Sequence, residues 1–275
     1  MYFEPTRKGV LSWNTYAERG LLEFRLLRAH SPATPWMPHA QWTTDGRTSF
    51  SSAHQDVTVD IDVISATQPF DGIEVRAQAV DFAMLAFASP IANRPSLPYL
   101  GASRILDVPP RSQFVVTGER GWCSPTSLSM LNAFHGIALD VPTTARGVFD
   151  RAYNGTGNWS FNVAFSGLLG LRAAVVYLRN FDHAEQLIAA NIPIAISYSW
   201  KDRDLPGAPI EQSDGHLAVL RGFAANGDCA MNDPASDHLS PIYPRAALET
   251  IWLRGGGVAY VVAPVGIDFV SIVNR

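Results

Sequence analysis

Apolar and polar residues alternate with a period of two along much of the first hundred residues. Leu22, Phe24 and Leu26 alternate with charged residues, and the run 57–63 places valine or isoleucine at every second position. Such alternation is typical of strands with one buried face, and several of them in series predict a β-sandwich. Phe70-Asp71-Gly72 is one of the expected turns. We therefore expect residues 1–100 to form an antiparallel β-sandwich domain.

The pattern changes after residue 90. Prolines and a glycine punctuate residues 90–111, which is typical of a linker and of the entry to a second domain, expected over residues 101–275. Helical spacing comes first in this second part and short apolar runs follow, so the chain is expected to be α+β. Besides a helix at Cys123, helices are predicted over 143–152, 161–169, 182–191 and 245–253, and strands over 172–178, 192–200, 216–223, 229–232 and 257–263.

The composition excludes several classes of function. Apolar residues make up 47% of the chain, and the net charge is −4 with lysine and arginine scattered. The sequence has no basic stripe and no run of about 18 apolar residues, so neither a nucleic-acid partner nor membrane insertion is expected. Met1-Tyr2-Phe3-Glu4-Pro5 lacks a signal-peptide pattern. Two cysteines without a Cys/His cluster predict no disulfide framework, no metal and no other cofactor, and leave the oligomeric state open.

The stretch Gly121-Trp122-Cys123-Ser124-Pro125 places a cysteine at the predicted start of a helix. Proline is favoured in a first turn, Thr126 and Ser127 are expected to satisfy free backbone donors there, and Gly136 predicts the helix end. A helix N-terminus and a nearby imidazolium lower a thiol pKa from about 8.5 to about 3.5–7.5. Cys123 is therefore a candidate nucleophile, although an isolated cysteine is more often a small core residue.

A base for this nucleophile is offered by His216, which follows glycine at the start of an apolar strand. The next strand ends at Asp233, and the connection contains the hairpin signal Asn226-Gly227. Because a hairpin brings the far ends of its strands together, we expect His216 and Asp233 to be neighbours, with the acid orienting the imidazole. Asn232 is the alternative orienter, since alternation turns only one of the two toward the histidine. Each residue alone is more often structural, and only the combination points to nucleophilic catalysis.

Several fragments between residues 107 and 264 carry a family resemblance. They are Asp107-Val108-Pro109, Ser112-Gln113, Trp122-Cys123-Ser124-Pro125-Thr126-Ser127, Gly155-Thr156-Gly157-Asn158-Trp159, Gly215-His216-Leu217-Ala218, Asn232-Asp233-Pro234-Ala235 and Gly257-Val258-Ala259-Tyr260. In this order they resemble the C39-like family of papain-fold cysteine peptidases. The resemblance covers more than half of the chain and implies a papain-like domain of a helix and an antiparallel sheet.

The resemblance also implies a mechanism. It implies a triad of Cys123, His216 and Asp233 that forms a thioester with a peptide substrate. Because some papain-like enzymes use asparagine to orient the histidine, Asn232 remains the alternative to Asp233 in that role. It implies that Gln113 donates its amide to the oxyanion beside the backbone N–H of Cys123, although Gln113 lies farther from the cysteine than is usual. An extracytoplasmic bacterial enzyme is implied as well. The sequence has no P-loop, so the double-glycine specificity of the transporter-linked members is not transferred.

One departure from the family pattern and two alternatives remain. Many papain-like nucleophiles are flanked by glycine, so the side chain of Ser124 is expected either to narrow the site or to reduce the freedom of the backbone near the oxyanion. The site would serve acyl transfer or cleavage of a small amide equally well. In the other alternative the second part is catalytically silent and the sandwich binds glycan or peptide through Trp13, Trp36 and Trp42, although such aromatics are more often core residues. Trp159 is expected either to line a cleft or to pack in the core.

Overall fold

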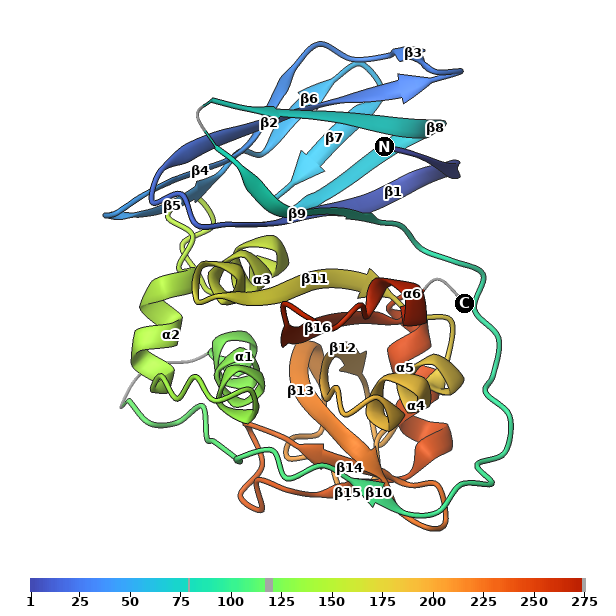
Figure 1. Ribbon diagram of the computed structural model, residues 1–275. Coiled ribbons are helices and arrows are strands. Elements are labelled where there is room, and N and C mark those ends of the chain that lie inside the picture. The colour runs from blue at the N-terminus through green and yellow to red at the C-terminus, as the bar shows by residue number, and fades with distance from the viewer. Residues whose placement is uncertain (79, 117–120, 274–275) are drawn as a thin grey trace.

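Figure 1 shows the computed structural model of the chain, which describes residues 1–78, 80–116 and 121–273. Two antiparallel sheets lie one above the other: the upper takes its strands from residues 2–88 and the lower from residues 104–264. Helices surround the lower sheet. The protein therefore has the α+β class that the sequence predicts.

The predicted alternation is clearest in β7, where Val57 and Val59 are buried and their neighbours are exposed, whereas the end of β1 is buried on both faces. All nine strands belong to one hydrogen-bonded sheet, and their apolar side chains gather in one cluster, so the sheet curls around a single core. In the sandwich expected over residues 1–100, all nine strands are thus hydrogen-bonded into one sheet, which is linked through β8 to β1, β2 and β7. The strands are β1 (Tyr2–Thr15), β2 (Gly20–Arg28), β3 (Ser31–Pro32), β4 (Met37–Thr43), β5 (Gly46–Ser49), β6 (Ser52–His54), β7 (Val57–Asp60), β8 (Val63–Ala77) and β9 (Phe82–Ala88).

Two turns lie elsewhere than the alternation predicts. The run 57–63 reads as one strand, but the chain reverses at Ile61 and Asp62 to begin β8. Ile61 adopts φ +59°, a left-handed conformation that is unfavourable for a β-branched residue. Phe70-Asp71-Gly72, expected as a turn, lies inside β8, where the pairing with β1 shifts its register. A period of two alone does not distinguish a tight reversal from a continuous strand.

The lower sheet has the strand order β11-β16-β12-β13-β14-β15, with β10 paired to β13. Its inner strands are buried on both faces, because α1 lies on one side while α4 and α5 lie on the other. The strands are β10 (Arg104–Ile105), β11 (Leu171–Tyr177), β12 (Ile194–Trp200), β13 (Ser213–Phe223), β14 (Cys229–Asn232), β15 (Ile242–Tyr243) and β16 (Val258–Pro264). The helices are α1 (Cys123–Phe134), α2 (Val141–Val148), α3 (Trp159–Leu168), α4 (Phe181–Ala189), α5 (Arg245–Arg254) and α6 (Val270–Val273).

The two sheets share a polar and apolar interface. The Asn14 side chain of β1 accepts from the backbone N–H of Ala173 at 2.9 Å and donates to the carbonyl of the same residue at 2.9 Å. Phe161 and Ala164 of α3 belong to the core of the upper sheet. Buried hydrogen bonds of this kind fix one relative orientation of two packed layers.

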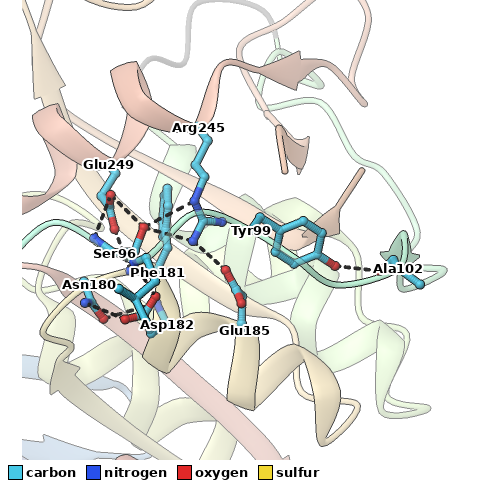
Figure 2. Close-up of polar contacts among 10 residues, drawn as sticks. Ser96, Tyr99, Ala102, Asn180, Phe181, Asp182, Glu185, Arg245 and Glu249 are labelled. Atoms are coloured by element: carbon cyan, nitrogen blue, oxygen red, sulfur yellow. Dashed lines mark hydrogen bonds and ion pairs between the residues drawn. The ribbon is translucent and has the colours of Figure 1, made fainter. Parts of the chain in front are cut away.

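Residues 89–103 run without regular secondary structure along the side of the lower sheet, at the right of Figure 1. This strap is held by the network in Figure 2. Glu249 accepts from the backbone N–H of Ser96 at 3.3 Å and from its hydroxyl at 2.9 Å, while Arg245 donates to the same hydroxyl and to Glu185. Leu97 N–H donates to the Asp182 carboxylate at 3.0 Å. The proline-rich segment is therefore bound along its length to the lower half.

Replacing Glu249 by alanine is expected to lower the free energy of unfolding by about 2–3 kcal/mol, because buried donors that lose their acceptor keep their full desolvation cost. The donors left unpaired are Phe181 N–H, 2.8 Å from Oε1, and the two Ser96 groups. Urea unfolding measures the change. Glu74→Ala, which removes a partly exposed ion-pair partner of Arg25, is the control and is expected to cost less than about 1 kcal/mol. Equal losses in both variants would contradict this role of Glu249.

Candidate active site

Cys123 is the first residue of α1 and is partly exposed to solvent. Backbone N–H groups of Ser124 and Leu217 bond to its sulfur, which places the thiol at the positive end of the helix. The predicted helix start is correct, and the helix ends as predicted at Gly136, which has φ +87°. The predicted side-chain capping is wrong: the Ser127 hydroxyl donates to the carbonyl of Leu217 instead, at 3.1 Å. That bond ties α1 to β13, the strand that carries the histidine.

His216 lies on β13, next to the cysteine helix. The predicted hairpin of β13 and β14 forms, with Gly227 at φ +86° in its turn. His216 Nε2 lies 2.8 Å from Asp233 Oδ1, and both side chains are buried. Since Asp233 occupies Nε2, Nδ1 is the ring nitrogen left for the side-chain hydrogen bond between His216 and Cys123. The imidazole therefore lies between a carboxylate and a thiol.

The electrostatics favour an ion pair. Burial raises the pKa of the Cys123 thiol, but the hydrogen bond and the charge of His216, together with the backbone N–H groups of Leu217 and Ser124, lower it, and the net pKa is lowered. For His216, burial alone lowers the pKa, yet the bonds to Asp233 and Cys123 raise it to about 10. The thiolate is thus present above the lowered cysteine pKa, and the imidazolium persists until pH rises through the histidine pKa. Between these limits the pair carries opposite charges.

The tyrosines and the tryptophan around Asp233 and His216 are site residues that sequence reasoning missed. Tyr243 Oη donates to Asp233 Oδ2 at 2.7 Å, and Tyr198 Oη donates to the same atom at 3.4 Å. The rings of Tyr198 and Trp200 stand edge-on to the imidazole, with centroids 5.5 and 5.7 Å away. These aromatic side chains exclude water from the acid–imidazole bond, which strengthens it. Alternation along β12 could have placed Tyr198 and Trp200 on one face, whereas nothing local marks Tyr243.

Tyr243→Phe is expected to lower the free energy of unfolding by about 1.5–3 kcal/mol, because Asp233 loses its shortest hydroxyl donor and a hydrogen bond to a charged group is stronger than a neutral one. Urea unfolding measures the effect. Tyr99→Phe removes a hydroxyl that donates to the carbonyl of Ala102 on the exposed strap and serves as the control. A Tyr243 variant no less stable than the Tyr99 variant would contradict this expectation.

Asn232 does not contact the histidine. Its side-chain amide donates to the carbonyl of Val108 at 2.7 Å, and its oxygen accepts from Ser240 at 2.8 Å. The backbone N–H of Gln113 donates to the carbonyl of Pro234, the residue after Asp233, at 2.9 Å. Its side-chain oxygen is buried without a hydrogen-bond partner, and Gln113 is absent from the described residues that line the cleft at Cys123. The structure thus brings the cysteine, the histidine and Asp233 together but does not bring the Gln113 amide into the cleft.

A cleft of about 600 Å³ opens at the Cys123 sulfur. Ser124 is one of its lining residues, and the Ser124 hydroxyl is buried, 2.9 Å from Tyr260 Oη. One wall contains Gly155, where an added Cβ would come within 2.8 Å of the Tyr153 ring. The lining residues are Gly121, Trp122, Cys123, Ser124, Phe149, Tyr153, Asn154, Gly155, Thr156, Gly157, Trp159, Ser197, Asp214, Gly215, His216 and Leu217.

The tryptophans divide into two groups. Trp159 lines the cleft, in agreement with the first of its two sequence interpretations. Trp13 and Trp42 are only 2% and 6% exposed and stack on each other in the core of the upper sheet. Trp36 is half-buried, and the guanidinium groups of Arg25 and Arg76 lie 4.8 and 4.3 Å from the centroid of its ring. Buried rings offer no platform for a glycan, so two of the three aromatics proposed for a binding module serve the core instead.

Within residues 1–78, 80–116 and 121–273, no group of three or more His, Cys, Asp or Glu side chains could hold a metal ion. In the same part of the chain, no helix is long and apolar enough to cross a membrane.

A thiol at a helix start and an imidazole oriented by a carboxylate line one cleft. This arrangement is typical of cysteine-peptidase-type sites. The model of the Peptidase_C39 like family matches residues 105–260, more than half of the chain, and the chain belongs to this family. The family predicted from the sequence fragments is thereby confirmed.

Solved structures are similar to this chain at low sequence identity. A putative C39-like peptidase from Bacillus anthracis is 18% identical, with a TM-score of 0.44, over 59% of this chain and 98% of its own. A double glycine motif protease from an AMS/PCAT transporter, solved in complex with the leader peptide, is 15% identical, with a TM-score of 0.40, over 61% of this chain and 97% of its own. Among curated proteins, none matches the chain.

Proposed function

We propose that this protein is a cysteine peptidase in which Cys123, His216 and Asp233 hydrolyse a peptide bond through a thioester. The observation that carries the proposal is the position of His216, which is bonded through Nε2 to Asp233 at 2.8 Å and lines the same cleft as the partly exposed Cys123 thiol. A nucleophile, a base and an orienter for the base are the parts that covalent amide hydrolysis requires.

In the first half of the reaction, the Cys123 thiolate attacks the carbonyl carbon of the scissile bond, and the π electrons move to the oxygen. The tetrahedral intermediate collapses, the C–N bond breaks, and His216 gives its Nδ1 proton to the leaving amine. In the second half, water attacks the thioester while Nδ1 takes its proton. Release of the acid product restores the thiolate and the imidazolium.

The backbone N–H of Cys123 is the first proposed donor to the tetrahedral oxyanion, since a helix start offers free N–H groups. Gln113 is proposed as the second donor on the ground of the family resemblance alone, because Gln113 does not line the cleft in this structure. Loss of one such donor typically lowers kcat about 10²–10³-fold.

The test is incubation with a mixed library of unstructured peptides, analysed by mass spectrometry. The wild-type protein and Cys229→Ala, which changes a buried thiol outside the cleft, are expected to cleave the same peptides, and Cys123→Ala none. Cys123→Ala should still bind the cleaved peptides. A library left intact by the wild-type protein, together with slow alkylation of Cys123, would contradict the proposal. Transfer of acyl groups to an added amine without release of free acid would replace hydrolysis by acyl transfer.

A further inference from the structure

Residues 149–159 form one wall of the cleft and contribute the rings of Phe149, Tyr153 and Trp159 to it. This segment connects α2 to α3 and belongs to the lower half of the molecule. The catalytic side chains, in contrast, bond only to residues of the lower half among the described contacts, as with Asp233 and Tyr243. The wall bonds to the lower half through Thr156, which donates to the carbonyl of Gly121 at 3.4 Å, but its two ends also bond to the upper sheet.

The first end of the wall is bound to the hairpin of β4 and β5 in the upper sheet. Arg151 N–H donates to the carbonyl of Arg47 at 3.0 Å, and Arg47 and Asp150 form an isolated parallel bridge. The Asp150 carboxylate accepts from Ser49 N–H at 3.1 Å. The guanidinium of Arg151 also donates to the carbonyl of Asp45. The backbone of the wall thus pairs with β5, the strand at the edge of the upper sheet.

Asp150 also fixes the shape of the wall from within. Its Oδ1 accepts from the backbone N–H groups of Ala152 at 3.0 Å and Tyr153 at 3.4 Å, and its Oδ2 accepts from Asn158 Nδ2 at 2.9 Å. Asp150 is fully buried, so each of these bonds satisfies a charge that water does not reach. The carboxylate therefore couples the conformation of the loop to the β5 strand that donates to it.

The second end of the wall is bound by the reversal between β7 and β8. Asp62 accepts from Ser160 N–H at 3.0 Å and from Trp159 N–H, so an upper-sheet carboxylate lies at the N-terminus of α3. The Ser160 hydroxyl donates to the carbonyl of Leu11 at 2.8 Å. Asp62 is almost fully buried, and burial raises its pKa to about 7 against these hydrogen bonds. The neighbouring Ile61 is held at positive φ, and backbone strain of this kind persists only where the surroundings over-determine it.

We propose that the upper sheet is a positioning element of the active site: Asp62 and the β4–β5 hairpin hold the wall 149–159 and so set peptide affinity without taking part in the chemistry. This inference rests on the proposed function, since it assigns the wall to the binding of the same substrate. It replaces an independent ligand-binding role of the upper sheet by a structural contribution to the cleft. Asp62 is accordingly a positioning residue.

The experiment compares Asp62→Ala with Asp56→Ala, a carboxylate of the same sheet that bonds to Arg28 and to Gln68 N–H, away from the wall. On a peptide that the wild-type protein cleaves, Asp62→Ala is expected to raise KM about tenfold and to leave kcat within about twofold. Asp62→Asn, which keeps an acceptor oxygen, is expected to restore most of the affinity. Arg151→Met changes an exposed side chain with little risk to folding and is expected to raise KM in the same direction.

Two further readouts separate this inference from the proposed function. Hydrogen exchange of the backbone amides at 150–161 is expected to speed up in Asp62→Ala and Arg151→Met, with no change in α1. The alkylation rate of Cys123 by iodoacetamide is expected to stay unchanged in both. Unchanged exchange of the wall, or a fall in kcat without a rise in KM, would overturn the positioning role. Slow alkylation in the wild-type protein would instead refute the proposed catalytic pair and leave the exchange result standing.

Discussion

Replacing His216 by alanine is expected to lower kcat/KM for peptide hydrolysis on the order of 10⁴-fold or more. The variant loses the group that stabilises the thiolate, protonates the leaving amine and activates water for the second step. Initial rates on the best library peptide measure the effect. The side chain is buried, so circular dichroism and urea unfolding must show that the variant is folded.

His135→Ala is the matched control for this expectation. His135 lies in the same half of the molecule, where its Nε2 is 2.8 Å from the carbonyl of Val262, and it does not line the cleft. Its replacement is expected to change kcat/KM by less than about twofold, because no reacting group loses a partner. If both histidine variants lost activity equally, a general effect on folding rather than the loss of a base would explain the result.

Replacing Asp233 by alanine is expected to lower the free energy of unfolding by about 3–5 kcal/mol, since removal of one partner of a buried charged pair leaves the others uncompensated. Here the groups left are His216 Nε2, Tyr243 Oη and Ala235 N–H. Activity is expected to fall as well, about 10²–10⁴-fold, because the imidazole loses its orienter and its counter-charge. Urea unfolding and kcat measure the two effects separately.

Asp233→Asn distinguishes orientation from charge. The amide oxygen still accepts from His216, so the loss of stability is expected to be about 1 kcal/mol. Without the carboxylate charge the pKa of His216 falls, and the alkaline limit of the rate profile moves to lower pH. Asp228→Ala, at the opposite end of the same hairpin, is the control and is expected to leave both limits unchanged. An asparagine variant as unstable as the alanine variant would contradict the separation of the two effects.

Local sequence signals predicted the elements that carry the candidate site. The helix at Cys123 was predicted because the start and stop signals of a helix are short-range, and they act here at Pro125 and Gly136. The approach of His216 to Asp233 was predicted because two alternating strands flank an Asn-Gly turn. Alternation could not decide between Asn232 and Asp233, since either register was compatible with the strand. The hydrogen bonds of Asn232 to Val108 and Ser240 show which residue faces away.

Contacts between residues that are far apart in the chain could not be predicted from the sequence. Tyr243 reaches Asp233 from the two-residue strand β15, which has too little pattern to be recognised. The alternation predicted Asp62 on the polar face of a strand, but its side chain is buried and accepts a hydrogen bond from Ser160 N–H at the start of α3. The linkage of all nine N-terminal strands into one sheet could not be predicted, because a period of two reports which face of a strand is buried and says nothing about which strands pair. The role of the Gln113 amide as a donor to the oxyanion stays a prediction.

The most direct test of the account is the pH dependence of Cys123 alkylation by iodoacetamide, followed by mass spectrometry in the wild-type protein and in His216→Ala. A lowered thiol pKa and a raised imidazole pKa predict fast labelling already at about pH 5–6, below the ordinary thiol pKa of about 8.5, and loss of this fast labelling without His216. Labelling of the wild-type protein that rises only near about pH 8.5, and that does not depend on His216, would show an ordinary thiol and contradict the thiolate–imidazolium pair on which the proposed function rests.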